Sequence, residues 1–161
     1  MAEHKRLIAV ALGLLSALAL IASLLPGTAG AAEARDLRAR AEAYLVTLGP
    51  DAVRVAPDRI EAPGVELLLA GPDERAIACP YYNFCAYSLR NFEGDLLLYE
   101  DCRYALSMPW FTTDGSWKNN QTPGRRARIN YLRGTHWDVP GAYSEQSSGM
   151  GWDQVGTIDP C

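Results

Sequence analysis

Four cysteines constrain the fold of this chain more strongly than any other feature of its sequence. They are Cys79, Cys85, Cys102 and Cys161. An even number of cysteines in a small exported protein indicates a disulfide framework, whereas in a reducing compartment the same residues favour a reactive thiol or a metal site. The destination of the chain therefore decides how the cysteines are interpreted.

The N-terminus has the pattern of an export signal. A basic start, MAEHKR, precedes an uncharged apolar run of 19 residues, 7–25. Pro26-Gly27 then breaks the helix, and Ala29 and Ala31 have the small-x-small spacing that signal peptidase recognises. The sequence therefore predicts a secreted, extracellular protein.

We expect cleavage after Ala31, which makes residues 1–31 the signal peptide, with the site after Ala34 as the second choice. The apolar run is also long enough to span a bilayer, so a retained membrane anchor is the alternative. The helix-breaking Pro-Gly, followed at once by small residues, favours cleavage and predicts no stable membrane anchor.

Composition limits the partners of the mature chain. Removing the first 31 of 161 residues leaves 130, enough for one modest domain and an extension. The formal net charge of −4 becomes −5, because Glu3, Lys5 and Arg6 are removed. Proteins that bind nucleic acids usually carry a basic excess, so we expect no nucleic-acid partner.

The mature chain offers few catalytic groups. His136 is its single histidine and lies in GTHWDVP, among aromatic and turn residues. A catalytic triad needs a histidine held by a third group and a nearby nucleophile, which oxidised cysteines cannot supply. Zinc needs several His or Cys ligands at short spacing. We therefore expect that the protein is not an enzyme and holds no metal ion. We expect His136 to be packed by Trp137.

Residues 32–78 predict a helix, a hairpin and a linker. Apolar residues recur at spacings of three and four at Leu37, Ala41, Tyr44, Leu45 and Leu48. This spacing predicts a helix that Gly49-Pro50 ends. Two short strands, Val53–Ala56 and Val65–Ala70, follow, and residues 71–78 form the linker. Because such a unit cannot hold a core alone, it docks on the rest, is removed as a propeptide, or is a loosely ordered extension.

The remainder, residues 79–161, predicts an all-β domain. Short β-prone runs alternate with Gly, Asn, Asp and Pro, which is typical of a small sandwich or barrel. The expected strands lie within residues 83–89, 94–101, 115–120, 125–132 and 153–159. A domain of this size supports only a small core, so disulfides are expected to stabilise it.

A short motif within this domain suggests its architecture. Tyr87, Phe92 and Gly94 are spaced as Tyr-x4-Phe-x-Gly, preceded by CPYYNFC and followed by YEDC and GSWKNNQT. This block resembles the secreted streptomycete metalloproteinase-inhibitor family, whose β/γ-crystallin-like Greek key folds a hairpin onto its own sheet. In that fold the two aromatic side chains pack across the hairpin, and the glycine takes a conformation that a side chain would obstruct. The end of the chain, WDVPGAYSEQSSGMGWDQVGTIDPC, also looks like the C-terminal repeat of actinobacterial members.

The resemblance implies a β/γ-crystallin-like Greek-key sandwich and a peptidase inhibitor that binds an extracellular metalloprotease or serine protease. We also expect the protein to be a monomer. The resemblance also implies a Cys79–Cys85 disulfide, which shares the spacing of the family's opening cysteine pair. Four cysteines can pair in three ways, and if Cys79 pairs with Cys85 the second disulfide is Cys102–Cys161. One feature departs from the family: inhibitory members close a rigid loop with a second short cysteine pair, whereas Cys102 and Cys161 are 59 positions apart. The inhibitory loop therefore cannot be carried over.

Calcium is the one cofactor that the resemblance suggests. Crystallin-type sites use adjacent Asn or Asp residues followed by Ser or Thr, whose oxygens converge on the ion. The nearest matches, TTDGSW around Asp114 and NNQTP around Thr122, are both degraded. We therefore expect no cofactor, with calcium as the alternative.

Exposed aromatic residues are the expected binding surface. The aromatic candidates are Trp110, Trp117, Trp137, Trp152, Tyr81, Tyr82, Tyr131 and Tyr143. We expect one or two tryptophans to be exposed, foremost Trp110 together with Phe111, because their neighbours place them in a loop. An alternative function is a crystallin-like module that binds cell-wall glycan or acts as a toxin-like effector.

Strand alternation also predicts that Arg126 and Arg128 share a solvated face, opposite Ala127 and Ile129.

Overall fold

The computed structural model describes residues 28–72, 74, 76–100, 102 and 106–161. The apolar run of the predicted export signal lies outside these residues. The chain divides into two compact units, Met1–Ala32 and Glu33–Cys161, and the fold described below belongs to the second. No helix within the described part has the length and apolar character needed to cross a membrane.

The first element, α1 (Thr28–Leu48), begins earlier than predicted and ends where expected. Its first turns are rich in alanine, the strongest helix former, so the helix contains both expected cleavage positions. Gly49 ends it in the left-handed conformation, with φ of 97°, and donates its N–H to the carbonyl of Leu45.

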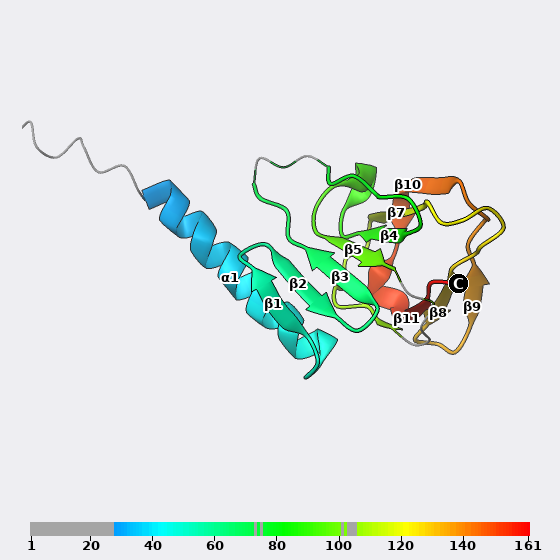
Figure 1. Cartoon of the computed structure of the whole chain (residues 1–161), viewed down its shortest axis with the longest axis horizontal. Helices are drawn as coiled ribbons and strands as arrows, with labels where there is room; N and C mark the ends of the chain where they lie inside the picture. Colours follow the sequence, from blue (N-terminus) through cyan, green and yellow to red (C-terminus); the bar gives the residue numbers. More distant parts are fainter. Residues whose placement is uncertain (1–27, 73, 75, 101, 103–105) are drawn as a thin grey trace, which may run out of the picture. The chain divides into compact units, whose positions relative to one another are not determined.

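Two antiparallel sheets follow the helix (Figure 1). The larger has the order β1-β2-β3-β5-β4-β7-β10, with bounds Val53–Ala56, Arg59–Ala62, Val65–Leu68, Leu96–Tyr99, Phe84–Tyr87, Gly115–Asn119 and Ser144–Met150 in that order. The smaller has the order β6-β11-β8-β9, with bounds Leu106–Ser107, Val155–Asp159, Arg128–Tyr131 and His136–Asp138. Two short 3-10 helices, η1 (Arg90–Phe92) and η2 (Trp152–Gln154), complete the fold. The predicted β-rich class with an N-terminal helix is confirmed.

The helix-and-hairpin extension docks on the rest of the chain, one of the three arrangements left open by the sequence. β3 pairs with β5 along its whole length, from Val65 opposite Tyr99 to Leu68 opposite Leu96. Strands β1–β3 therefore continue the sheet of the C-terminal part (Figure 1), and the boundary expected at Cys79 falls inside one sheet.

The predicted strands lie where the structure has strands, but the structure also has several strands that were not predicted. β1 has the predicted bounds, and β4, β5, β7, β8 and β11 lie within the predicted segments. β3 ends two residues early, because Leu69 and Ala70 donate their N–H groups to the Asp58 carbonyl and the Asp95 carboxylate instead of extending the ladder. Among the described residues, β2, β6, β9 and β10 were not predicted, since they are short or, in β10, almost entirely polar.

One hydrophobic core spans both sheets. It contains Phe84 and Trp117 of the larger sheet together with Ile129 and Ile158 of the smaller, each at most 2% exposed. A second cluster lies on β4 and β5, and both strands are buried along their full length. Burial on both faces gives these strands continuous apolar sequences instead of an alternating pattern.

The Tyr-x4-Phe-x-Gly motif forms a tight corner between β4 and β5. The rings of Tyr87 and Phe92 meet edge to face with centroids 5.7 Å apart. Gly94 has φ of 78°, and a Cβ atom at this position would lie against the Ser88 hydroxyl and 2.8 Å from Cγ of Leu89. The glycine is therefore required both by its backbone conformation and by the space around it.

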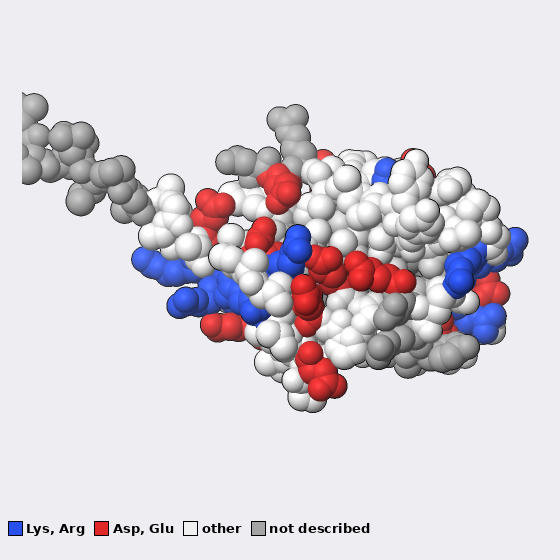
Figure 2. All heavy atoms as spheres, in the orientation of Figure 1, with Lys and Arg blue, Asp and Glu red and all other residues white. Residues whose placement is uncertain are grey.

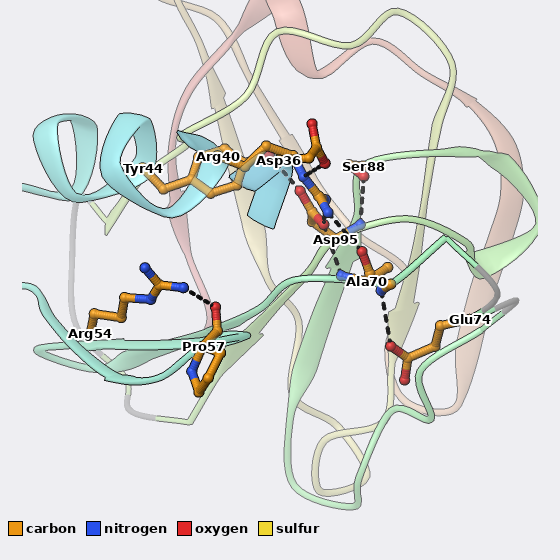
Figure 3. Close-up of polar contacts among 10 residues, drawn as sticks. Asp36, Arg40, Tyr44, Arg54, Pro57, Ala70, Glu74, Ser88 and Asp95 are labelled. Carbon is orange, nitrogen blue, oxygen red and sulfur yellow. Dashed lines mark hydrogen bonds and ion pairs between the residues drawn. The ribbon is translucent and has the colours of Figure 1, made fainter. Parts of the chain in front are cut away.

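Asp95, directly after this corner, holds the helix on the sheet (Figure 3). Its carboxylate is buried, with 4% of the residue exposed. It accepts hydrogen bonds from Nη1 of Arg40 at 2.6 Å, from the hydroxyl of Tyr44 at 2.6 Å and from the N–H of Ala70 at 2.9 Å. Burial, reinforced by the Asp95 charge, raises the pKa of Tyr44, so this hydroxyl stays protonated and donates.

We predict that Asp95→Asn destabilises the protein through loss of this network. Breaking a buried charged network costs about 3–5 kcal/mol, and because Arg40 keeps some contact with solvent we expect a loss of about 3 kcal/mol in the free energy of unfolding. Asp36→Asn is the matched control: Asp36 also pairs with Arg40, at 2.9 Å, but its side chain is 67% exposed. That exposed pair contributes below about 1 kcal/mol. Urea denaturation of both variants measures the difference, and equal losses would contradict the assignment.

We also predict that Gly94→Ala costs more stability than Gly134→Ala. Both glycines have left-handed φ, 78° and 82°, so alanine pays a backbone penalty of about 1–2 kcal/mol at either position. At Gly134 nothing lies within 4 Å of the added methyl group, whereas at Gly94 it meets Ser88 and Leu89. Thermal unfolding should show a clearly larger drop in Tm for Gly94→Ala. A drop no larger than that of Gly134→Ala would mean that the corner relaxes around the methyl group.

Candidate functional site

The loop between β6 and β7 presents one aromatic side chain to solvent. Phe111 is 70% exposed, as expected, but its neighbour Trp110 is only 4% exposed. The prediction that Trp110 is exposed is wrong, because its ring packs edge to face on Tyr44 of α1, with centroids 6.2 Å apart. The burial of Trp110 anchors the loop and leaves Phe111 projecting.

Hydrogen bonds hold this loop on both sides of the exposed phenylalanine. Before it, the N–H of Met108 donates to the Gly156 carbonyl at 3.2 Å. After it, the hydroxyl of Thr112 donates to the Ser88 carbonyl at 2.6 Å, and the Thr112 carbonyl accepts from the N–H of Asp153 at 3.1 Å. The loop is therefore fixed to β11, to the β4 end and to η2.

Asp114 closes the same loop at its far end. One carboxylate oxygen accepts from the N–H of Gly149 at 2.7 Å, and the other pairs with Arg90 at 3.3 Å. In TTDGSW, one of the two degraded calcium matches, the Asp114 carboxylate therefore fixes the loop. Among the residues that the structure describes, no group of three or more His, Cys, Asp or Glu side chains could hold a metal ion.

The other tryptophans are also withdrawn from solvent. Trp152 is fully buried and donates its indole N–H to the Tyr87 carbonyl at 2.7 Å, while Trp117 is 2% exposed. Trp137 is half-buried against Trp117, with ring centroids 5.7 Å apart. The expectation of one or two exposed tryptophans is therefore wrong, because this small core uses all four.

Tyrosines form the second exposed aromatic surface. Tyr81, Tyr82 and Tyr143 are 69%, 74% and 64% exposed. The first two lie in the loop closed by the Cys79–Cys85 disulfide, and the rings of Tyr81 and Tyr143 meet edge to face at 6.2 Å. This disulfide therefore holds two tyrosines out into solvent.

The backbone of the disulfide loop is fixed as well. Tyr82 has φ of 73°, a conformation that residues other than glycine rarely adopt. Its N–H donates to the Asn120 carbonyl at 2.9 Å, and the side chain of Asn83 donates to the Tyr81 carbonyl at 3.1 Å. Such strained positions cluster at functional sites, which singles out this loop.

A groove of about 520 Å³ lies beside the tyrosines. The motif aromatics Tyr87 and Phe92 line it, and the ammonium group of Lys118 lies 3.9 Å from the centre of the Phe92 ring. Lys118 also pairs with Glu145 at 3.0 Å. Burial, and next the Glu145 charge, raises the pKa of Tyr87 to about 12, so its hydroxyl remains a donor, to the Ile77 carbonyl at 2.9 Å.

The arginine-rich strand has the predicted alternation. Ala127 and Ile129 are fully buried, while Arg126 and Arg128 are exposed. Arg128 pairs with Asp138 at 2.6 Å, and this hydrogen bond lowers the pKa of the Asp138 carboxyl. These contacts describe a solvated strand face.

His136 lies on β9 and is exposed. Its side chain is therefore not packed by Trp137 as expected, because neighbouring strand residues point to opposite faces and Trp137 takes the inward one.

The cysteines pair as Cys79–Cys85 and Cys102–Cys161, the pairs that the resemblance implied.

Charged side chains are distributed unevenly over the surface (Figure 2). In this view they gather over α1 and β1–β3 and around β8 and β9, whereas the surface over β7 and β10 is mostly uncharged.

Comparison of the chain with protein-family models, with curated proteins and with solved structures gives no match. The exposed aromatic side chains form two surfaces, one at Phe111 and one at the tyrosines beside the Cys79–Cys85 disulfide.

We predict that the Cys102–Cys161 disulfide contributes more stability than Cys79–Cys85. The sequence separations are 59 and 6 residues. Loop entropy then gives about 4 kcal/mol for the long loop and about 2 kcal/mol for the short one. The double variants Cys102→Ser/Cys161→Ser and Cys79→Ser/Cys85→Ser should differ in this order in thermal unfolding. A larger loss of Tm in the short-loop variant would refute the prediction.

Proposed function

We propose that this protein is an exported, non-catalytic binding protein with a β/γ-crystallin-like Greek-key fold, which binds an extracellular peptidase through the loop between β6 and β7. The observation that carries the proposal is the projection of Phe111 from a loop whose flanking residues are buried or hydrogen-bonded. The motif corner, the predicted export signal and the two disulfides support the same assignment.

A fixed loop suits inhibition for an energetic reason. A flexible segment loses conformational freedom when it enters a protease cleft, and a preorganised segment avoids most of this cost. Burying a phenylalanine side chain in a specificity pocket then contributes about 2 kcal/mol. Here Trp110 and Thr112 take the place of the second short cysteine pair found in inhibitory members of the resembled family.

The proposal also selects among peptidases. Phe111 fits enzymes with a large apolar specificity pocket, such as thermolysin-like and subtilisin-like peptidases. A trypsin-like enzyme requires a basic side chain, and the loop from Met108 to Asp114 contains none. We therefore expect inhibition of the first two classes and no inhibition of the third.

Inhibition assays with the purified, oxidised mature chain test the proposal. We expect tight one-to-one inhibition of at least one enzyme with an apolar pocket, and Phe111→Ala should weaken it by at least about tenfold. Leu132→Ala is the matched control, because Leu132 is also an exposed apolar residue, at 67%, on another loop.

Two results would contradict the proposal. One is the absence of inhibition of every enzyme in the panel, or inhibition that Phe111→Ala leaves unchanged. The other is turnover of a peptide, ester or glycan substrate that disappears in His136→Ala, which would show that the protein is an enzyme.

A further inference from the structure

The groove beside the Cys79–Cys85 loop is separate from the Phe111 loop, and no residue of that loop lines it. We infer that this groove is a second binding site, and that its ligand is a neutral oligosaccharide. Its volume of about 520 Å³ lies within the range of about 300–1,000 Å³ that is usual for small-ligand sites. A flat protein interface would offer no such hollow.

The tyrosines at the groove supply surfaces on which sugar rings can stack. Tyr143 lines the groove, and Tyr81 meets it edge to face while both remain more than 60% exposed. A tyrosine has an apolar body and a polar tip, and is suited to contacts that are apolar at one end and wet at the other. A pyranose has the same division, with C–H groups on its faces and hydroxyl groups around its edge.

The charges of the groove favour a ligand without net charge. Lys118 and Glu145 are the charged residues among its described lining, and they neutralise each other at 3.0 Å. An anionic or cationic ligand would have to compete with this ion pair. Adjacent hydroxyl groups of a sugar can instead donate to the carboxylate and accept from the ammonium group without separating the two.

An amide provides a further polar contact. The side-chain nitrogen of Asn120 donates to the Cys79 carbonyl at 3.0 Å, which fixes the orientation of the amide. Because Asn120 lines the groove, its amide oxygen is an acceptor that a sugar hydroxyl or acetamido group could use. Apolar surface with a few fixed polar groups is the usual composition of a ligand site.

The disulfide loop prepares the site before the ligand arrives. The Cys79–Cys85 bond, the Tyr82 N–H bond to Asn120 and the Asn83 contact fix the loop in one conformation. Tyrosine side chains lose little conformational entropy on binding, and a fixed backbone reduces the cost further. The left-handed conformation of Tyr82 is then part of the site's construction.

Calorimetric titration of the oxidised mature chain tests the inference with three neutral hexasaccharides: the β-1,4-linked hexamers of N-acetylglucosamine and of glucose, and the α-1,4-linked hexamer of glucose. We expect saturable binding of at least one. Tyr143→Ala and Tyr81→Ala should each raise Kd at least about tenfold, whereas Tyr143→Phe, which keeps the ring, should stay within about threefold of the wild type. Thermal unfolding of each variant verifies that it is folded.

Phe111→Ala is the control that separates this site from the proposed peptidase contact, and it should bind the sugar as the wild type does. Absence of saturable binding for all three hexasaccharides would overturn the inference. So would tighter binding of a sulfated hexasaccharide than of its neutral counterpart, or equal loss in Phe111→Ala and Tyr143→Ala. Capture of a peptidase that is lost in Tyr143→Ala, without sugar binding, would instead assign the groove to a protein partner.

Discussion

The buried carboxylate of Asp95 connects three segments that are distant in the sequence. Through Arg40 and Tyr44 it fixes α1, and through the N–H of Ala70 it fixes the chain just after β3. Asp95 also affects the loop between β6 and β7, because the ring of Tyr44 packs edge to face against the ring of Trp110. The position of the exposed loop between β6 and β7 therefore depends on a charge that is buried beneath the helix.

The two aromatic surfaces are held by different physical means. The Phe111 loop is anchored noncovalently, by a buried indole and by hydrogen bonds to three other segments. The tyrosine loop has hydrogen bonds too, but it is also anchored covalently, by a disulfide between cysteines only six positions apart. Both arrangements hold side chains in solvent that are not part of the core, namely Phe111 in one loop and Tyr81 and Tyr82 in the other.

Local patterns in the sequence were sufficient where a signal was contained within a few residues. The end of α1 at Gly49 follows from glycine conformation and the bounds of β1 from strand propensity, while the corner at Gly94 was expected from the resemblance of the Tyr-x4-Phe-x-Gly motif. β10 was missed because its polar sequence becomes a strand only through pairing with β7. Trp110 was misplaced because its burial depends on α1, more than 60 residues earlier, and the role of Asp95 was missed for the same reason.

The pairing of β3 with β5 has a consequence for the integrity of the chain. Both disulfides join residues after position 78, so the part from α1 to β3 is attached to the rest covalently only through the backbone of residues 71–78. A protease cut in that segment would leave two fragments held by a strand ladder, an apolar core and the Asp95 network. The nicked protein would then be a heterodimer of its own halves, complete in structure and separable only by unfolding.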